Sequence, residues 1–194
     1  MDARQELVDR MNPNRTIIDR MIGAARLDIP TYEEVEHDAS LTAQAAIVVA
    51  LAALARAIGG IDGGSTHGLS GLMTALSLWL VWAGITYLIG DKVLGGTATW
   101  GELLRTLGFA QAPGLLAVVG VFGPLSGVTE LVVSIWLLIT GIVAIRQALD
   151  FSTGKAILTA LLGWLSAIAV AVLIALAIGG MAAIFGGIAS MFGG

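Results

Sequence analysis

Two charged side chains inside long apolar stretches are the first candidates for chemistry in this sequence. Arg56 lies near the end of the apolar run 41–58, and Glu130 lies near the start of the run 127–145. Charges inside a membrane are costly and often mark ion or proton pathways. A single pair at one depth does not form a proton relay, so we predict a structural ion pair between Arg56 and Glu130. A transport pathway through the same pair is the alternative.

Two other arrangements of reactive side chains do not predict catalysis. Ser152 and Lys155 have the S-x-x-K spacing of serine acyl-transfer enzymes, but the companion motifs of those enzymes are missing. A helix cap followed by a lysine at the membrane surface is the better interpretation. His37 and His67 are predicted on opposite sides of the membrane, so they cannot share a metal ion. We therefore expect no catalytic residue, no metal site and no enzymatic activity.

Four tryptophans lie inside the apolar runs, whereas tryptophan in membrane proteins is usually found at the ends of the spans. They are Trp79, Trp82, Trp136 and Trp164. We interpret them as packing residues between helices, because tryptophan buries a large area. Contact with a bound lipid, a pigment or a quinone is the alternative, and no cofactor is predicted.

The composition that surrounds these residues is that of a membrane protein. The chain is 57% hydrophobic and 12% charged, with a mean hydropathy of +0.90, whereas soluble domains carry about 25% charged residues. The apolar runs are continuous, whereas the strands of a membrane barrel alternate apolar and polar residues. We therefore predict an all-α fold, a polytopic bundle of transmembrane helices. The net charge of −4 gives no indication of nucleic-acid binding.

Five apolar runs approach the roughly 20 residues that a helix needs to cross a bilayer. They are 41–58, 68–89, 106–125, 127–145 and 156–177. With a cytoplasmic N-terminus and five crossings, every Lys and Arg except Arg56 falls on the cytoplasmic side, as the positive-inside rule requires. Without the weak third run, Arg146 and Lys155 would lie outside. The charges thus favour five spans and an external C-terminus.

The spans divide the chain into three predicted parts, which are residues 1–40, residues 41–178 and residues 179–194. The first part is polar and contains amphipathic surface helices, one of which starts at Asn12-Pro13 and presents Ile18 and Ile22 on its apolar face. A T-x-x-E capping box at Thr31 and Glu34 is expected to open the next helix. The middle part is the membrane domain.

The last part is rich in glycine. Pairs recur every seven residues, at Gly179 and Gly180, Gly186 and Gly187, and Gly193 and Gly194. This spacing places small residues on one helix face, and small residues let membrane helices approach closely. We expect these glycines to pack against other membrane protein subunits.

The polar stretch 99–113 is predicted to be the pivot of the topology. Trp100 begins a short interfacial helix that contains Arg105, and Gly108 and Pro113 turn the chain into the third span. Without the span that follows this stretch, the distribution of positive charges no longer agrees with the positive-inside rule.

The same region carries a resemblance to a known family. The run Gly108-Phe109-Ala110-Gln111-Ala112-Pro113 precedes the third span, and a proline-containing hairpin leads to a fourth span with Trp136. A polar loop with Ser152, Gly154 and Lys155 and the leader LDIPTYEEVEHDASLTAQA complete the pattern. Over residues 20–178 the chain resembles the bacterial form of the Yip family (Ypt/Rab-interacting membrane proteins).

The resemblance implies a five-span bundle with a cytosolic N-terminus in the bacterial inner (cytoplasmic) membrane. Eukaryotic members act in membrane traffic with prenylated GTPases. Their D-L-Y-G-P motif is absent here and Phe109 replaces the usual Tyr, so a Rab-type role is not expected.

The leading functional hypothesis is a non-enzymatic accessory subunit or organiser of a larger membrane protein complex, with the lipid bilayer and other membrane subunits as partners. A small transporter or channel is one alternative. A membrane adaptor that recruits cytosolic partners through residues 1–40 is the other.

Overall fold

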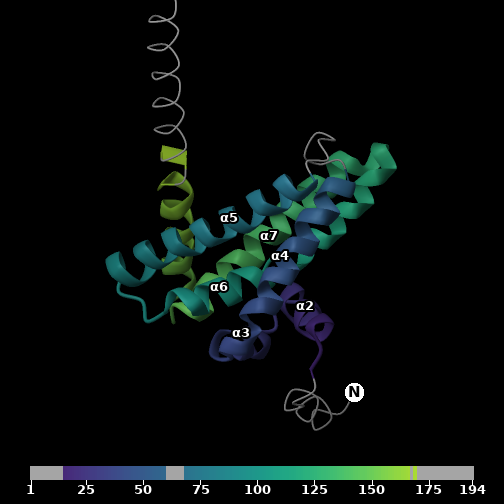
Figure 1. Cartoon of the computed structure of the whole chain (residues 1–194). Helices are drawn as coiled ribbons and strands as arrows, with labels where there is room; N and C mark the ends of the chain where they lie inside the picture. Colours follow the sequence, from purple (N-terminus) through teal and green to yellow (C-terminus); the bar gives the residue numbers. More distant parts are fainter. Residues whose placement is uncertain (1–14, 60–67, 167, 170–194) are drawn as a thin grey trace, which may run out of the picture.

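The computed structural model describes residues 15–59, 68–166 and 168–169, and every regular element in these ranges is a helix (Figure 1). An N-terminal pair precedes the long helices. The elements are α2 (Ile17–Ala25), α3 (Ile29–His37), η1 (Ala39–Leu41), α4 (Thr42–Ile58), α5 (Gly68–Tyr87), the π-helical η2 (Leu88–Val93), α6 (Trp100–Phe109), the 3-10-helical η3 (Ala112–Leu125) and α7 (Ser126–Ala148). A further helix begins at residue 153. The predicted all-helical fold is confirmed for these ranges.

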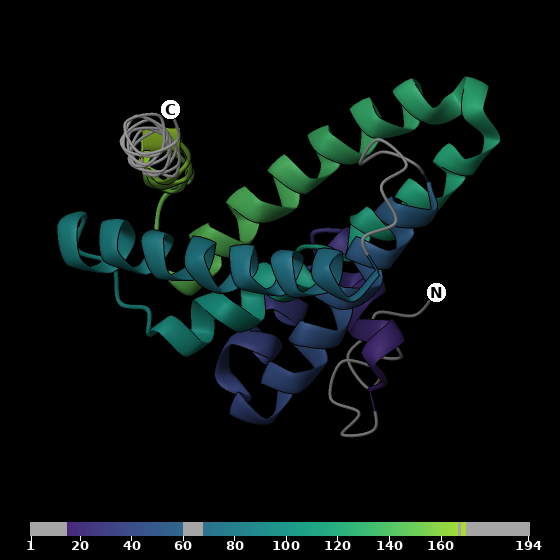
Figure 2. The same cartoon turned by 45° about the horizontal axis from the view of Figure 1, so that its top comes forward.

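Among the described residues, three helical segments are long and apolar enough to cross a membrane: Ala39–Ile58, Ser70–Val93 and Trp100–Ala148. The third has 49 residues and would be about 74 Å long if it were straight. It is bent sharply at Phe122 and Gly123, whose backbone angles are not helical, and Pro124 follows. The chain therefore folds back there as a hairpin, in which α7 packs along η3 (Figure 2).

These segments confirm a polytopic helical membrane protein, but five crossings remain a prediction. The hairpin near residue 123 corresponds to the turn expected between the third and fourth runs. The fifth run, 156–177, extends beyond the described residues. The glycine-rich part 179–194 also lies outside them.

A seam of small residues holds α4 against the first arm of the hairpin. A Cβ atom on Gly108 would lie 2.7 Å from the Ala45 Cβ, and one on Gly120 would lie 2.7 Å from the Gly59 carbonyl oxygen. Between them, a Cβ atom on Gly114 would lie 3.0 Å from the Ala52 Cβ. Close approach of this kind lets membrane helices gain van der Waals contact along their length.

The two N-terminal helices begin at caps that differ from the expected ones. Thr16 caps α2 and forms a reciprocal capping box with Asp19; the expected start at Asn12-Pro13 lies outside the described residues. The capping box predicted at Thr31 and Glu34 is wrong, because Asp28 caps α3 by accepting a hydrogen bond from the Thr31 backbone N–H. Glu34 is instead occupied by ion pairs with arginines.

The C-terminal end of α2 contains an unusual backbone position. Leu27 has φ +63°, in the left-handed region. Its N–H donates to the Ala24 carbonyl at 3.1 Å, and the Asp28 N–H donates to the Gly23 carbonyl at 3.0 Å, the pair of bonds that closes a Schellman motif. Glycine usually occupies this position, since a side chain there costs about 1–2 kcal/mol.

The seam gives a first prediction. Gly108→Ala should lower the free energy of unfolding by about 1–3 kcal/mol, because the new methyl group collides with Ala45. Gly141→Ala on α7 is the control, since a Cβ atom there meets nothing within 4 Å; it should be neutral or stabilising by up to about 1 kcal/mol. Thermal unfolding in detergent measures both. Equal melting temperatures for the two variants would contradict the close packing of Gly108 against Ala45 at the seam.

Candidate functional site

At the docking surface between the N-terminal helices and the membrane helices, side chains donate hydrogen bonds to backbone carbonyl groups at helix ends. The last carbonyl groups of a helix have no partner within it and require donors from elsewhere. Arg105 of α6 supplies them to α3. Its Nε donates to the Val35 carbonyl at 2.8 Å, and its terminal nitrogen donates to the Glu36 carbonyl. The guanidinium is buried, with Arg105 6% exposed, and its charge also complements the negative end of the α3 dipole.

The end of α2 is satisfied in the same way. The Tyr32 hydroxyl donates to the Ala24 carbonyl at 3.1 Å, and the Trp136 Nε1 of α7 donates to the Ala25 carbonyl at 2.8 Å. Tyr32 is fully buried, and burial raises its pKa above the usual range, which keeps the hydroxyl neutral and able to donate. Both membrane arms, α6 and α7, thus hold the N-terminal pair.

Arginine side chains join α2 and α3 to the start of α4. Glu34 accepts from Arg20 Nε at 2.8 Å and also pairs with Arg15. A terminal nitrogen of Arg20 donates to the Gln44 Oε1 at 3.2 Å. Arg20 is 7% exposed, so its ion pair with Glu34 is screened less by salt than a surface ion pair. Together with the bond to Gln44, this ion pair fixes the position of α2 on the bundle.

Of the predicted pivot residues, Arg105 takes part in this surface and Gly108 takes part in the seam. Trp100 begins α6 and is exposed, and Thr99 before it forms a capping box with Glu102. Arg105 caps α3, Gly108 lies in the seam, and Pro113 is buried near the start of η3. Arg105 thus connects the predicted pivot to the N-terminal helices, while the role of this stretch in the topology stays a prediction.

The structure places Arg56 and Glu130 at one small cavity. This cavity has a volume of about 40 Å³ and is also lined by Val133 and Ser134. The described residues include no Arg56–Glu130 contact within 4.0 Å, so the ion pair remains a prediction. A cavity of this volume has room for a water molecule, and its lining supplies charged and hydroxyl groups.

The other reactive side chains have local contacts. The Lys155 ammonium lies 3.5 Å from the Leu94 carbonyl oxygen and 5.0 Å from the centre of the Phe151 ring. The Ser152 carbonyl accepts from the Ala156 N–H, as expected at a helix start. His37 bonds the Glu33 carbonyl at 2.9 Å. His67 and the predicted packing glycines, Gly179, Gly180, Gly186, Gly187, Gly193 and Gly194, lie outside the described residues. In the part of the chain that the structure describes, no group of three or more His, Asp or Glu residues could hold a metal ion.

The sequence interpretation missed three residues that satisfy carbonyl groups. They are Tyr32, Trp79 and Thr140. Thr140 donates to the Ala110 carbonyl at 2.8 Å where α6 ends, and the Trp79 Nε1 donates to the Leu104 carbonyl at 3.0 Å. For Trp79 and Thr140, a polar group isolated in an apolar run was the available signal, since such groups require a partner when buried.

The carboxyl group of Glu36 has a raised pKa because of its environment. Burial is the main cause that raises its pKa to about 7, and the nearby carboxylates of Glu102 and Asp150 add to this rise. His37 opposes the shift, and its own pKa is raised by its bond to the Glu33 carbonyl and by Glu36. The end of α3 therefore changes charge near neutral pH.

Comparison of the sequence with models of known protein families shows which family the chain belongs to. The model of the Yip1 domain matches residues 29–174. The chain belongs to the Yip1 domain family. Yip1 proteins are involved in membrane trafficking and are generally non-enzymatic. The chain matches no curated protein and no solved structure. The Yip1 domain begins at α3, so its match contains Arg105, Trp136 and Tyr32 of the docking surface.

Loss of the Arg105 guanidinium should release α3. Arg105→Gln should lower the free energy of unfolding by about 2 kcal/mol, because buried carbonyl groups lose charged donors, and amides of residues 29–37 should exchange with deuterium faster. Arg146→Gln, at an exposed position in the last turn of α7, is the control and should change neither quantity by much. Unchanged exchange in Arg105→Gln would show that α3 docks without this cap.

Glu36 gives a prediction about pH. Since its pKa is about 7 in the fold against an ordinary value of 4.5, the folded state binds the proton more tightly. This contribution is complete below pH 4.5 and is lost as the pH rises through 7. The melting temperature should therefore fall between pH 5 and pH 8, and Glu36→Gln should flatten the profile. Glu33→Gln, at an exposed position, should keep the slope; an unchanged slope in Glu36→Gln would assign the dependence to His37.

Proposed function

We propose that this Yip1-domain protein is a non-enzymatic accessory subunit or organiser of a larger membrane protein complex. The observation that carries the proposal is the exposure of α5. In the apolar segment Ser70–Val93, which contains most of α5, only 11% of the residues are buried inside the protein. The corresponding share is 33% for the segment Ala39–Ile58, which contains α4. A span with so little contact in its own chain has a large lateral surface for lipid or for a partner helix.

The residues on this surface favour a partner helix. Gly71, Thr74 and Ser77 are exposed at intervals of three along α5, while Trp79 is buried and bonds α6. Small and hydroxyl side chains are enriched where membrane helices meet, because they permit close approach and interhelical hydrogen bonds. Lipid chains fill such a surface less well than the side chains of another helix.

The proposed topology places the N-terminus in the cytoplasm and the C-terminus outside a bacterial inner membrane, with five crossings. Contacts at one end of the bundle support it. The Thr97 hydroxyl donates to the Asp150 carboxylate at 2.7 Å, and Lys155 reaches Leu94, so the two predicted cytoplasmic loops lie together. The fold-back at Gly123 supports two crossings in the segment Trp100–Ala148.

Observations on the alternatives favour the subunit proposal. The cavity at Arg56 and Glu130, about 40 Å³ in volume, fits a structural contact better than a transport pathway. For the adaptor, α2 leaves Ile18 and Ile22 exposed, at 62% and 45%, and an apolar face of this kind favours the membrane surface over a cytosolic partner.

Native mass spectrometry of protein purified from its own membrane tests the complex. We expect an assembly heavier than the single chain of 19.9 kDa, and its loss in the double variant Thr74→Leu, Ser77→Leu, because the larger side chains prevent close helix contact. Gly127→Leu on α7, where a Cβ atom meets nothing within 4 Å, should retain the assembly. A wild-type protein that is only monomeric, or a double variant that still assembles, would refute the proposal.

A further inference from the structure

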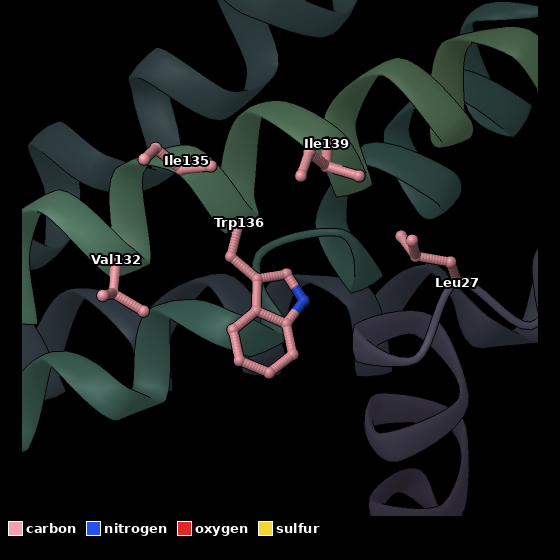
Figure 3. A pocket seen from close by; sticks show the side chains of 5 residues that line it. All are labelled: Leu27, Val132, Ile135, Trp136 and Ile139. Carbon is pink, nitrogen blue, oxygen red and sulfur yellow. The ribbon is translucent and has the colours of Figure 1, made fainter.

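An apolar groove lies between the end of α2 and one face of α7. Its volume is about 310 Å³, which falls in the range of small-molecule sites. One wall is Leu27, at the end of α2. The other is formed by four side chains of α7: Val132, Ile135, Trp136 and Ile139 (Figure 3). Its lining is almost wholly apolar, so a hydrocarbon chain is the ligand that its chemistry accepts.

The direction of the groove agrees with the path of a lipid chain. Val132 and Ile139 are seven residues apart on α7, which is about 10 Å along a helix. Leu27 follows α2 at one side, and Trp136 bonds the Ala25 carbonyl there. Ile18 and Ile22 leave α2 with an exposed apolar face, as in helices that lie in the headgroup plane of a membrane. The end of α2 therefore corresponds to the headgroup level, and α7 continues from it into the hydrocarbon.

A cationic side chain adjoins the groove. Arg26 immediately precedes Leu27, is exposed, and has no ion-pair or side-chain hydrogen-bond partner among the described residues. Arg15, just before α2, and Arg20, within it, both form ion pairs with Glu34. An arginine near the headgroup level attracts the negative charge of an anionic lipid.

The backbone of Leu27 is a further observation that points to this place. Its φ of +63° is the conformation in which glycine is most favourable. A leucine there costs stability, yet its side chain forms one wall of the groove. Strained backbone is found at ligand sites more often than elsewhere, and a glycine at this position would remove the wall that Leu27 forms.

From these contacts we propose that the groove between Leu27 and α7 binds one acyl chain of an anionic phospholipid of the bilayer, whose phosphate lies at Arg26. The ligand is bound laterally from the membrane, and the site depends on the docking of α2 by Tyr32 and Trp136. The proposal is independent of the partner complex, because it involves α7 and α2 and leaves the exposed face of α5 unused.

Native mass spectrometry of the full chain in detergent, titrated with phosphatidylglycerol or phosphatidylcholine, tests the site. Wild-type protein should retain phosphatidylglycerol in preference to phosphatidylcholine. Arg26→Gln should reduce that preference about fivefold, the effect of one arginine near an anionic surface. Ile135→Trp should fill the groove and reduce binding of both lipids. Leu138→Trp is the matched control, since Leu138 is also an exposed residue of α7, 61% exposed, and does not line the groove.

A second variant keeps the test decisive if Ile135→Trp fails to fold. Leu27→Gly removes one wall while the left-handed φ is retained without strain, so the protein should melt at the same or a higher temperature and bind less lipid. Equal retention of the two lipids by wild-type protein would overturn the proposal. Wild-type affinity in Leu27→Gly, or an equal loss in Leu138→Trp, would overturn it as well.

Discussion

The need to satisfy backbone carbonyl groups at buried helix ends determines how the two halves of this protein fit together. In apolar surroundings an unpaired carbonyl costs several kcal/mol by transfer estimates. The helices α2 and α3 both end against the membrane domain, and Arg105, Trp136 and Tyr32 provide the donors. Arg105 and Trp136 come from the two arms of the α6–η3–α7 segment. The N-terminal pair is thereby tied to both arms, and its docking requires the hairpin to have folded back correctly.

Packing of small residues supplies the second constraint. The contacts of Gly108, Gly114 and Gly120 with α4 bring backbones close enough that a single methyl group is excluded. This seam is confined to α4 and the first arm. In contrast, the described part of α5 buries only Trp79, Ala83 and Thr86 and leaves most of its surface exposed. The result is a bundle with one tightly packed side and one open side, an arrangement suited to a protein that has further neighbours in the membrane.

Much of the architecture follows from patterns visible in the sequence. The apolar runs predict the membrane helices, Gly123-Pro124 predicts the hairpin, and the stretch with Arg105 and Gly108 predicts a junction. The role of Arg105 was not predictable, because its partners are backbone carbonyl groups some 70 residues away. Every residue has a backbone carbonyl group, so the residue types at these positions do not indicate the contact. The capping box at Thr31 was predicted wrongly, since the pattern ignores that Glu34 is needed by Arg15 and Arg20. The groove at Leu27 was equally hidden, because it arises only when α2 lies against α7.

The separation of these contacts along the chain has a consequence for biosynthesis. The Arg105 bond to Val35 spans 70 residues, and the Trp136 bond to Ala25 spans 111 residues. A ribosome makes α2 and α3 first, so their final partners do not exist until α6 and α7 have been translated and inserted. During that interval the carbonyl groups of Ala25, Val35 and Glu36 lack the donors from α6 and α7. The exposed Ile18 and Ile22 allow α2 to lie on the membrane surface meanwhile. The docking of α2 can therefore be completed only after α7 has been synthesised, because Trp136 of α7 supplies the donor for Ala25.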